Sequence, residues 1–147
     1  MPAIPQFSAT VFATDTAAVR DLYVDLFALD VVTDLGWFVS LRRGGSAWEL
    51  CVWDPNHESV PAGVDATAAP AGVVLAFVVD DVDALVGAAE QRGVELLGPA
   101  VDEPWGQRHV FLRDPAGTVV DVVQITTPDP AWLAANGIAP EDVPVPT

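Results

Sequence analysis

Two acidic residues, Glu49 and Asp121, lie at corresponding positions of two strand-like segments, residues 47–53 and 118–125. Successive side chains of a strand point to opposite faces, so each acid shares its face with every second residue of its segment. Because a carboxylate is costly to bury without a partner, we expect these faces to be the solvated, functional ones. Two carboxylates in one site could act as general acid and general base. The alternative is that they are hydrogen-bonded residues without a catalytic role.

The side chains that accompany the two acids are mostly apolar or aromatic. Strand alternation and hairpin pairing predict that the same faces carry Phe12, Phe38, Cys51, Trp53, Arg108 and Val110, with Trp105 at the edge. The same parity turns His109 away from the site. An apolar lining with a few polar groups is typical of a small-molecule pocket, so these residues and the two acids are the candidate ligand-binding residues. The lone cysteine is more typical of packing than of nucleophilic catalysis.

The elements that must position these residues form one pattern written twice. Each half reads as a strand, an amphipathic helix that begins after an aspartate, a short strand and a β-hairpin. In the first half these are residues 7–13, the helix after Asp15, residues 31–33, and the hairpin of residues 37–42 and 47–53. In the second half they are residues 73–79, the helix after Asp81, residues 94–97, and the hairpin of residues 108–113 and 118–125. The sequence therefore predicts an α+β fold of two βαβββ modules whose curved mixed sheets surround a cavity.

The length suits one domain over residues 1–147. Module one is expected at about residues 5–55 and module two at about 72–126, with a linker rich in proline, glycine and alanine at 56–71. Residues 127–147 form a C-terminal tail with a short helix. When the two helix starts are aligned, Ser8 of module one corresponds to Val74 of module two.

Several motifs of the second half resemble those of a known superfamily. They are Val78-Val79-Asp80-Asp81-Val82-Asp83, Trp105-Gly106-Gln107-Arg108, and Phe111-Leu112-Arg113-Asp114-Pro115-Ala116-Gly117. With the doubled βαβββ order, they are similar to the vicinal oxygen chelate superfamily of glyoxalases, bleomycin-resistance proteins and extradiol dioxygenases. The resemblance covers roughly residues 5–126.

The resemblance implies metal-ligand positions on the first and last strands of each module, which here are Ser8, Glu49, Val74 and Asp121. Metal-binding members carry histidine, glutamine or glutamate on the first strand, whereas Val74 cannot coordinate and Ser8 is a weak ligand. Two carboxylates suit Zn²⁺, Fe²⁺ or Ni²⁺ poorly, although they could hold Mg²⁺ or Mn²⁺ weakly. We therefore expect vestigial metal positions and no resident cofactor.

The charge balance excludes two classes of partner. Six arginines and no lysine stand against 21 acidic residues, which gives a net charge of −15 and a pI near 4.1. Nucleic acids and anionic membranes would repel such a chain. The first residues lack the basic and apolar regions of a signal peptide, and no apolar run could span a bilayer, so the sequence predicts a cytoplasmic protein.

These observations favour a small-molecule binding protein over an enzyme. The expected activity is sequestration of an antibiotic or aromatic metabolite, as in metal-free bleomycin-resistance proteins, and a flat cation suits the negative charge. The alternative is an enzyme of the same superfamily, either a divalent-metal lyase, isomerase or dioxygenase, or a cofactorless cyclase with Glu49 and Asp121 as acid and base. A structural or interaction module is a third reading. The resemblance also implies a homodimer.

Overall fold

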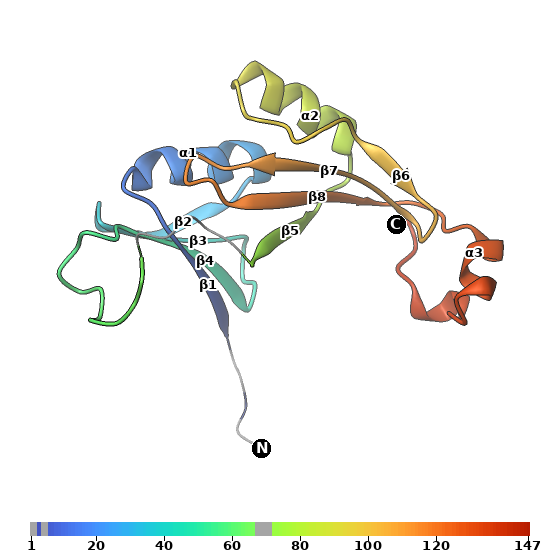
Figure 1. Cartoon of the computed structure of the whole chain (residues 1–147), viewed down its shortest axis with the longest axis horizontal. Coiled ribbons are helices and arrows are strands. Elements are labelled where there is room, and N and C mark those ends of the chain that lie inside the picture. The colour runs from blue at the N-terminus through green and yellow to red at the C-terminus, as the bar shows by residue number, and fades with distance from the viewer. Residues whose placement is uncertain (1–2, 4–5, 67–71) are drawn as a thin grey trace. The chain divides into compact units, whose positions relative to one another are not determined.

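The computed structural model describes residue 3 and residues 6–66 and 72–147, and it folds as two βαβββ modules (Figure 1). Each module is a mixed four-stranded sheet with one helix, which confirms the predicted α+β class. The chain divides into two compact units. The first contains the chain up to Val73 together with the turn Asp114–Thr118, and the second contains Val74–Arg113 and Val119–Thr147. The expected start of module one at residue 5, and residues 67–71 of the expected linker, lie outside the described residues.

The first unit is built on a sheet of strand order β1-β4-β3-β2, in which β1 and β4 are parallel and the other pairs antiparallel. Its elements are β1 (Phe7–Phe12), α1 (Thr16–Phe27), β2 (Asp30–Asp34), β3 (Phe38–Arg42) and β4 (Trp48–Trp53). Helix α1 begins as predicted, because the Asp15 side chain accepts a hydrogen bond from the Ala18 amide. It ends where Ala28 adopts a left-handed conformation with φ 51°.

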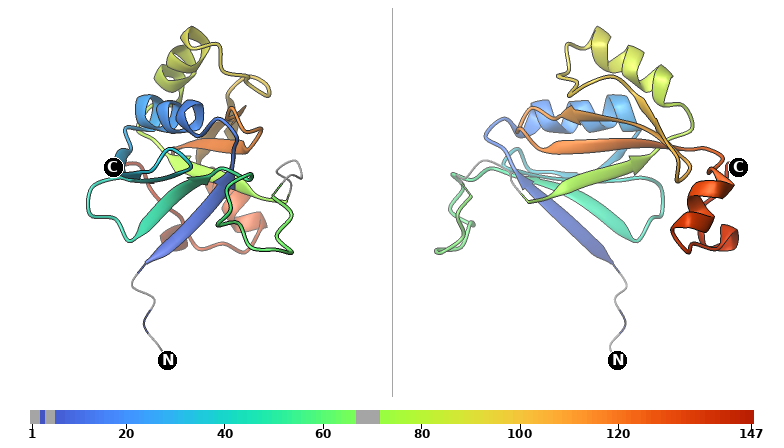
Figure 2. Two further views of the ribbon diagram at one scale, coloured as in Figure 1. Left: turned by 90° about the vertical axis from the view of Figure 1, so that its left-hand side faces the viewer. Right: turned by 45° about the vertical axis from the view of Figure 1, so that its right-hand side comes forward.

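The core of the first unit lies between α1 and one face of this sheet (Figures 1 and 2). The helix contributes its apolar stripe, and β3 and β4 contribute alternate residues; all are buried, and they are Val19, Leu22, Tyr23, Phe27, Val39, Leu41, Leu50 and Val52. Trp48 shares the parity of Leu50 and would be expected in this core, but it is 36% exposed. It pairs with the exposed Phe7 at the start of the strand, so the helix does not cover it.

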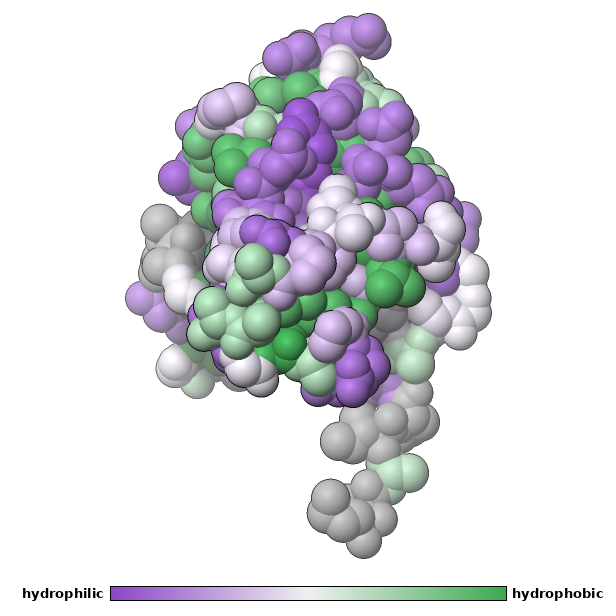
Figure 3. Space-filling model, turned by 90° about the vertical axis from the view of Figure 1, so that its right-hand side faces the viewer, coloured by the Kyte–Doolittle hydropathy of each residue, from purple (hydrophilic) through white to green (hydrophobic). Residues whose placement is uncertain are grey.

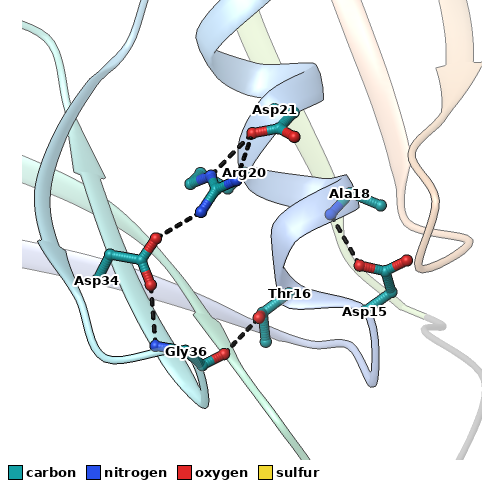
Figure 4. A network of polar contacts seen from close by, with 7 residues as sticks. All are labelled: Asp15, Thr16, Ala18, Arg20, Asp21, Asp34 and Gly36. Carbon is teal, nitrogen blue, oxygen red and sulfur yellow. Dashed lines mark hydrogen bonds and ion pairs between the residues drawn. The ribbon is translucent and has the colours of Figure 1, made fainter.

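A polar network ties the start of α1 to the loop after β2 (Figure 4). Arg20 bonds to Asp34 at 2.6 Å, and the other Asp34 oxygen accepts from the Gly36 amide. The Thr16 hydroxyl donates to the Gly36 carbonyl. The Gly36 amide and the Arg20 guanidinium together lower the pKa of Asp34. The network fixes the loop that leads into β3.

The second unit repeats the arrangement with strand order β5-β8-β7-β6. Its elements are β5 (Val74–Val78), α2 (Val82–Gln91), β6 (Val101–Glu103), β7 (Gln107–Arg113) and β8 (Val119–Ile125). Asp81 caps α2 through the Ala84 amide, as predicted. The short strand expected at residues 94–97 is displaced along the chain: Leu96 makes an isolated bridge to Leu112, and β6 supplies the edge strand.

The C-terminal tail packs on the second unit through the turn between β6 and β7. The Thr126 amide donates to the Gly106 carbonyl, and the Asp129 amide donates to the Pro104 carbonyl. Beyond these bonds lie α3 (Pro130–Ala135) and the 3₁₀ helix η1 (Pro140–Asp142). A Cβ atom on Gly106 would meet the Thr126 carbonyl oxygen at 2.8 Å, so the close approach of the tail requires glycine.

Among the described residues, no helix has the length and apolar character needed to cross a membrane. Several large apolar side chains are nevertheless exposed, and one face of the surface shows hydrophobic residues among hydrophilic ones (Figure 3). The edge strand β5 contributes Val74 and Val78, and Val73 precedes it.

Candidate functional site

The first unit brings the predicted residues around Glu49 together on the sheet face opposite α1. Cross-strand partners share a face, and the register pairs Ser8 with Glu49, Ser40 with Cys51, and Phe38 with Trp53. The Ser40 hydroxyl donates to Glu49 Oε2 at 2.7 Å. The other carboxylate oxygen lies 3.9 Å from an Arg42 nitrogen. The Glu49 carboxylate is therefore fixed by Ser40 and Arg42, and 16% of its side chain is exposed.

Three aromatic rings occupy the end of the same face. The rings of Phe12 and Trp53 stack with centroids 5.7 Å apart and planes 25° apart. Phe38 meets Trp53 edge-on at 6.3 Å and 86°. All three side chains are half-buried, so the rings still offer apolar surface to solvent. We call Phe12, Phe38 and Trp53 the aromatic face.

Residues after β4 complete this aromatic end, and the sequence did not indicate them. The His57 ring stacks on Trp37 with centroids 3.7 Å apart and planes 3° apart. Ser59 accepts a hydrogen bond from the Trp53 indole at 3.0 Å and lies 2.7 Å from His57 Nδ1. Asp54-Pro55-Asn56 signals a turn at this place, but the ring stacking has no local sequence signature.

Cys51 lies on the predicted face but is only 5% exposed. Burial raises the pKa of its thiol, and the charge of Glu49 acts in the same direction. A thiol whose ionisation is opposed is a poor nucleophile at neutral pH. The structure therefore fits the packing role expected for this residue.

In the second unit, the face that carries Asp121 differs from the prediction. Phe111 pairs with Asp121, and His109 pairs with Val123. His109 therefore lies on the Asp121 face: its Nδ1 is 3.0 Å from an Asp121 oxygen and its Nε2 is 3.2 Å from a Glu103 oxygen. The expectation that His109 points away is wrong.

The hairpin turn explains this change of face. A two-residue loop at Pro115-Ala116 would pair Asp114 with Gly117. Instead Gly117 adopts a positive φ of 87° as a third loop residue, and the Asp114 amide donates to the Thr118 carbonyl. This is the three-residue loop with a glycine bulge, and it shifts the register by one. A one-residue shift exchanges the two faces of a strand.

The same shift overturns the predicted placement of Arg108 and Val110. Val110 is 1% exposed and belongs to the core, on the face opposite Asp121. Arg108 forms two hydrogen bonds with Asp83 of α2, at 2.8 and 3.2 Å, and a third with Asp102 at 3.1 Å. Its guanidinium lowers the pKa of Asp83. Arg108 thus joins the helix to the sheet and does not accompany Asp121.

The two acids are nevertheless held in the same way. Ser40 of β3 bonds to Glu49 across one diagonal of the β3–β4 pair, two residues before its register partner Cys51. His109 of β7 bonds to Asp121 across the same diagonal of the β7–β8 pair. In each module, a side chain of the third strand therefore binds the acid on the last strand. It is the Ser40 hydroxyl in the first module and the His109 imidazole in the second.

The first-strand positions test whether these acids could hold a resident metal. Ser8 is the β1 partner of Glu49, as predicted, but the β5 partner of Asp121 is Ala76 rather than Val74. The alignment by helix starts fails here because the connection from strand to helix is two residues shorter in the second module. Ala76 has no donor atom. A hydroxyl and a carboxylate already bonded to Ser40 suit a transition metal poorly. Across the described part of the chain, no group of three or more histidine, cysteine, aspartate or glutamate residues is arranged to hold a metal.

Trp105 lies on the turn between β6 and β7. Its indole donates to Gln107 at 3.0 Å, and its ring packs against Trp132 of α3 with centroids 5.6 Å apart. It remains 37% exposed. The tail thus supplies a second ring beside the one that the sequence singled out.

Comparisons with known proteins agree with this architecture. The profile of the glyoxalase-like domain matches residues 7–126. The lactoylglutathione lyase of Agrobacterium tumefaciens is 27% identical, with a TM-score of 0.64 over 84% of this chain and 96% of that one. An antibiotic binding protein from a Streptomyces species is 26% identical, with a TM-score of 0.61 over 81% of this chain and 93% of that one. A protein from Sphaerobacter thermophilus, at 24% identity and a TM-score of 0.64 over 81% and 95%, shares the fold. No functionally curated protein matches the chain.

The match to the domain profile spans both modules, from β1 to the end of β8. The chain therefore belongs to the glyoxalase, bleomycin-resistance and dioxygenase superfamily, the vicinal oxygen chelate superfamily that its doubled motif resembles.

Proposed function

We propose that the protein binds a flat aromatic molecule, an antibiotic or an aromatic metabolite, and sequesters it unchanged. The observation that carries this proposal is the aromatic face, with its half-buried Phe12, Phe38 and Trp53 on the sheet face that also carries Glu49. An apolar surface with one fixed polar group is the usual composition of a small-molecule site. The antibiotic binding relative has this fold at 26% identity, which supports the same kind of activity here.

The energetics of such a site depend on the rings. Covering about 300 Å² of apolar surface contributes about 7 kcal/mol, from which association removes several kcal/mol. Micromolar affinity corresponds to about −8 kcal/mol, so burial alone is insufficient. Ring stacking adds about 0.5–1.5 kcal/mol for each pair. We therefore expect Trp53, which contacts both other rings, to contribute most.

A cation should bind better than an anion of the same shape. Glu49 lies on the same face as the rings, and the chain carries a net charge of −15. A planar cation can also interact with an indole face, for about 0.5–2 kcal/mol. Attraction by the net charge weakens with salt, whereas stacking persists.

The test is a calorimetric titration with proflavine, a flat tricyclic cation, and with pyrene sulfonate, a flat anion. We expect proflavine to bind, and Trp53→Leu to weaken binding about tenfold or more. Trp48→Leu is the matched control, because it removes an indole from the same strand but from the opposite parity. The proposal is refuted if no flat aromatic probe binds, or if both substitutions have equal effects.

We also propose that the protein is a homodimer. The edge strand β5 carries Val74 at 53% and Val78 at 65% exposure, and exposed apolar edges favour association. Sedimentation equilibrium should give a mass of two chains. Val78→Asp should shift the mass toward one chain, and a monomeric wild type at high concentration would contradict the proposal.

A second candidate function is cofactorless acid–base catalysis on the second unit. Its support is the hydrogen bond between His109 and Asp121, together with the 27% identity to a lactoylglutathione lyase. Both ring nitrogens face carboxylates, so His109 could accept a proton from a substrate only if its Nε2 contact with Glu103 opened when the substrate bound. If the protein converts a bound ligand into a product, and His109→Gln abolishes this conversion, the protein is an enzyme and does not act by sequestration. Metal recovered at one equivalent per chain and lost in Glu49→Ala would instead favour a metal enzyme.

A further inference from the structure

The ring of Trp53 is one member of a closed circuit of side chains at the end of the first sheet. Trp53 meets Phe38, which is adjacent to Trp37 in sequence and contacts it with centroids 5.9 Å apart. Trp37 stacks on His57, His57 bonds to Ser59, and Ser59 bonds back to Trp53. The Trp53 ring is thus restrained from two sides, by Phe38 and by Ser59.

The donor and the acceptor of each hydrogen bond in the circuit can be assigned from the geometry. The Ser59 amide donates to His57 Nδ1 at 3.2 Å, so this nitrogen is an acceptor. The Ser59 hydroxyl therefore donates its single proton to the same nitrogen at 2.7 Å. Its oxygen remains free to accept from the Trp53 indole at 3.0 Å. His57 orients the Ser59 hydroxyl, and the hydroxyl in turn orients the indole.

Backbone bonds hold the segment that carries Ser59. The Asp54 amide donates to the Trp37 carbonyl at 2.8 Å, which joins the end of β4 to the loop before β3. The His57 amide donates to the Asp54 carbonyl, and the Val60 amide donates to the His57 carbonyl, both at 3.1 Å. The Asp54 side chain also accepts from the Asn56 amide. Residues 54–60 therefore form a series of tight turns attached to the sheet.

We propose that Ser59 and His57 are positioning residues, which hold the Trp53 indole at the angle at which it meets the ligand. This inference rests on the proposed function, because it assumes that a ligand binds on the aromatic face. Its consequence is a specificity rule. The indole N–H of Trp53 is committed to Ser59, so Trp53 offers its ring face to the ligand and no hydrogen-bond donor. Trp53 therefore distinguishes ligands by the shape of their ring systems, whereas Glu49 distinguishes them by charge.

The first measurement is made without ligand, on the indole N–H signals in a ¹H–¹⁵N spectrum. The chain has five tryptophans, and Trp53→Phe identifies the Trp53 signal. We expect Ser59→Ala to shift this signal and accelerate its exchange with water, and Ser59→Thr to restore it by returning the hydroxyl. Ser46→Ala is the matched control, since Ser46 has an exposed hydroxyl that bonds to the Trp48 carbonyl. An unchanged Trp53 signal in Ser59→Ala would overturn the positioning role.

The second measurement is proflavine affinity. Loss of one neutral hydrogen bond corresponds to a weakening of about 3–10-fold, which we expect in Ser59→Ala and not in Ser59→Thr. His57→Phe should weaken binding in the same direction, because it keeps a ring beside Trp37 but removes the acceptor. If Ser59→Ala shifts the Trp53 signal but leaves the affinity unchanged, the positioning role is wrong. If the wild type binds neither proflavine nor pyrene sulfonate, the proposed function fails, and the indole signal shows separately whether the circuit exists.

Discussion

The buried tyrosine of the first unit should make the protein lose stability at alkaline pH. Tyr23 is fully buried, and its hydroxyl donates to Asp114 Oδ2 at 2.8 Å. Burial raises the pKa of Tyr23, and the charge of Asp114 adds to the effect. The unfolded chain therefore releases the phenolic proton at a lower pH than the folded chain. Stability contributed by this group is complete below pH ~10, the ordinary tyrosine value, and is lost as the pH rises above it.

The magnitude follows from the same linkage. At pH 11 the unfolded state gains about 1.4 kcal/mol from tyrosine ionisation. At pH 7, Tyr23→Phe should cost about 1.5–3 kcal/mol, the range for a hydrogen bond to a charged group. The cost should shrink by about 1.4 kcal/mol at pH 11, because the variant has no phenol to ionise.

The assay is urea unfolding between pH 7 and 11. The composition of the chain leaves few other groups whose titration would change the stability in this range. The chain has one tyrosine, one cysteine and no lysine, so few side chains titrate in this range. Burial also raises the pKa of Cys51, which acts with the same sign, and both proteins are therefore compared in a Cys51→Ala background. If the wild type and Tyr23→Phe lose stability in parallel, or if tyrosinate absorbance in the folded protein rises near pH 10, the reasoning is refuted.

Three further predictions test other parts of the structure. Asp81→Ala removes the cap of α2 and should cost about 1 kcal/mol in urea unfolding, whereas Asp80→Ala should cost less than about 0.5 kcal/mol. Gly106→Ala places a Cβ against the Thr126 carbonyl at a φ of 95° and should cost about 2 kcal/mol or more. Glu49→Gln should weaken proflavine binding about threefold or more in low salt and reduce its salt dependence, both measured by calorimetry.

The predictable parts of the fold depend on local signals. Asp15 and Asp81 cap their helices because a side-chain oxygen needs only the amide three residues ahead. The face of Glu49 also followed from alternation, because the register of β4 with β1 and β3 agrees with the expected parity. Such features need no knowledge of distant residues.

The parts of the site that were predicted wrongly or not at all depend on one loop residue or on contacts between distant residues. The extra loop residue at Gly117 exchanged the faces of β7, which brought His109 to Asp121 and sent Arg108 to α2. Recognition of the glycine bulge in the sequence after Asp114 could have indicated this register. No comparable signal predicts that His57 stacks on Trp37, because an aromatic contact across 20 residues depends on how both loops fold.

The two modules share a backbone plan but have diverged in the groups that surround each acid. Glu49 is held by a hydroxyl and lies on a face that ends in three aromatic rings. Asp121 is held by an imidazole that also contacts Glu103, and its first-strand neighbour is an alanine. Beside these acids, the first strands offer one hydroxyl and one methyl group, which is a poor ligand set for a transition metal. Stacking needs ring surface and a fixed indole, and the first unit supplies both. The groups around Glu49 therefore favour binding of a flat ligand on the first unit, and the groups around Asp121 favour acid–base chemistry on the second.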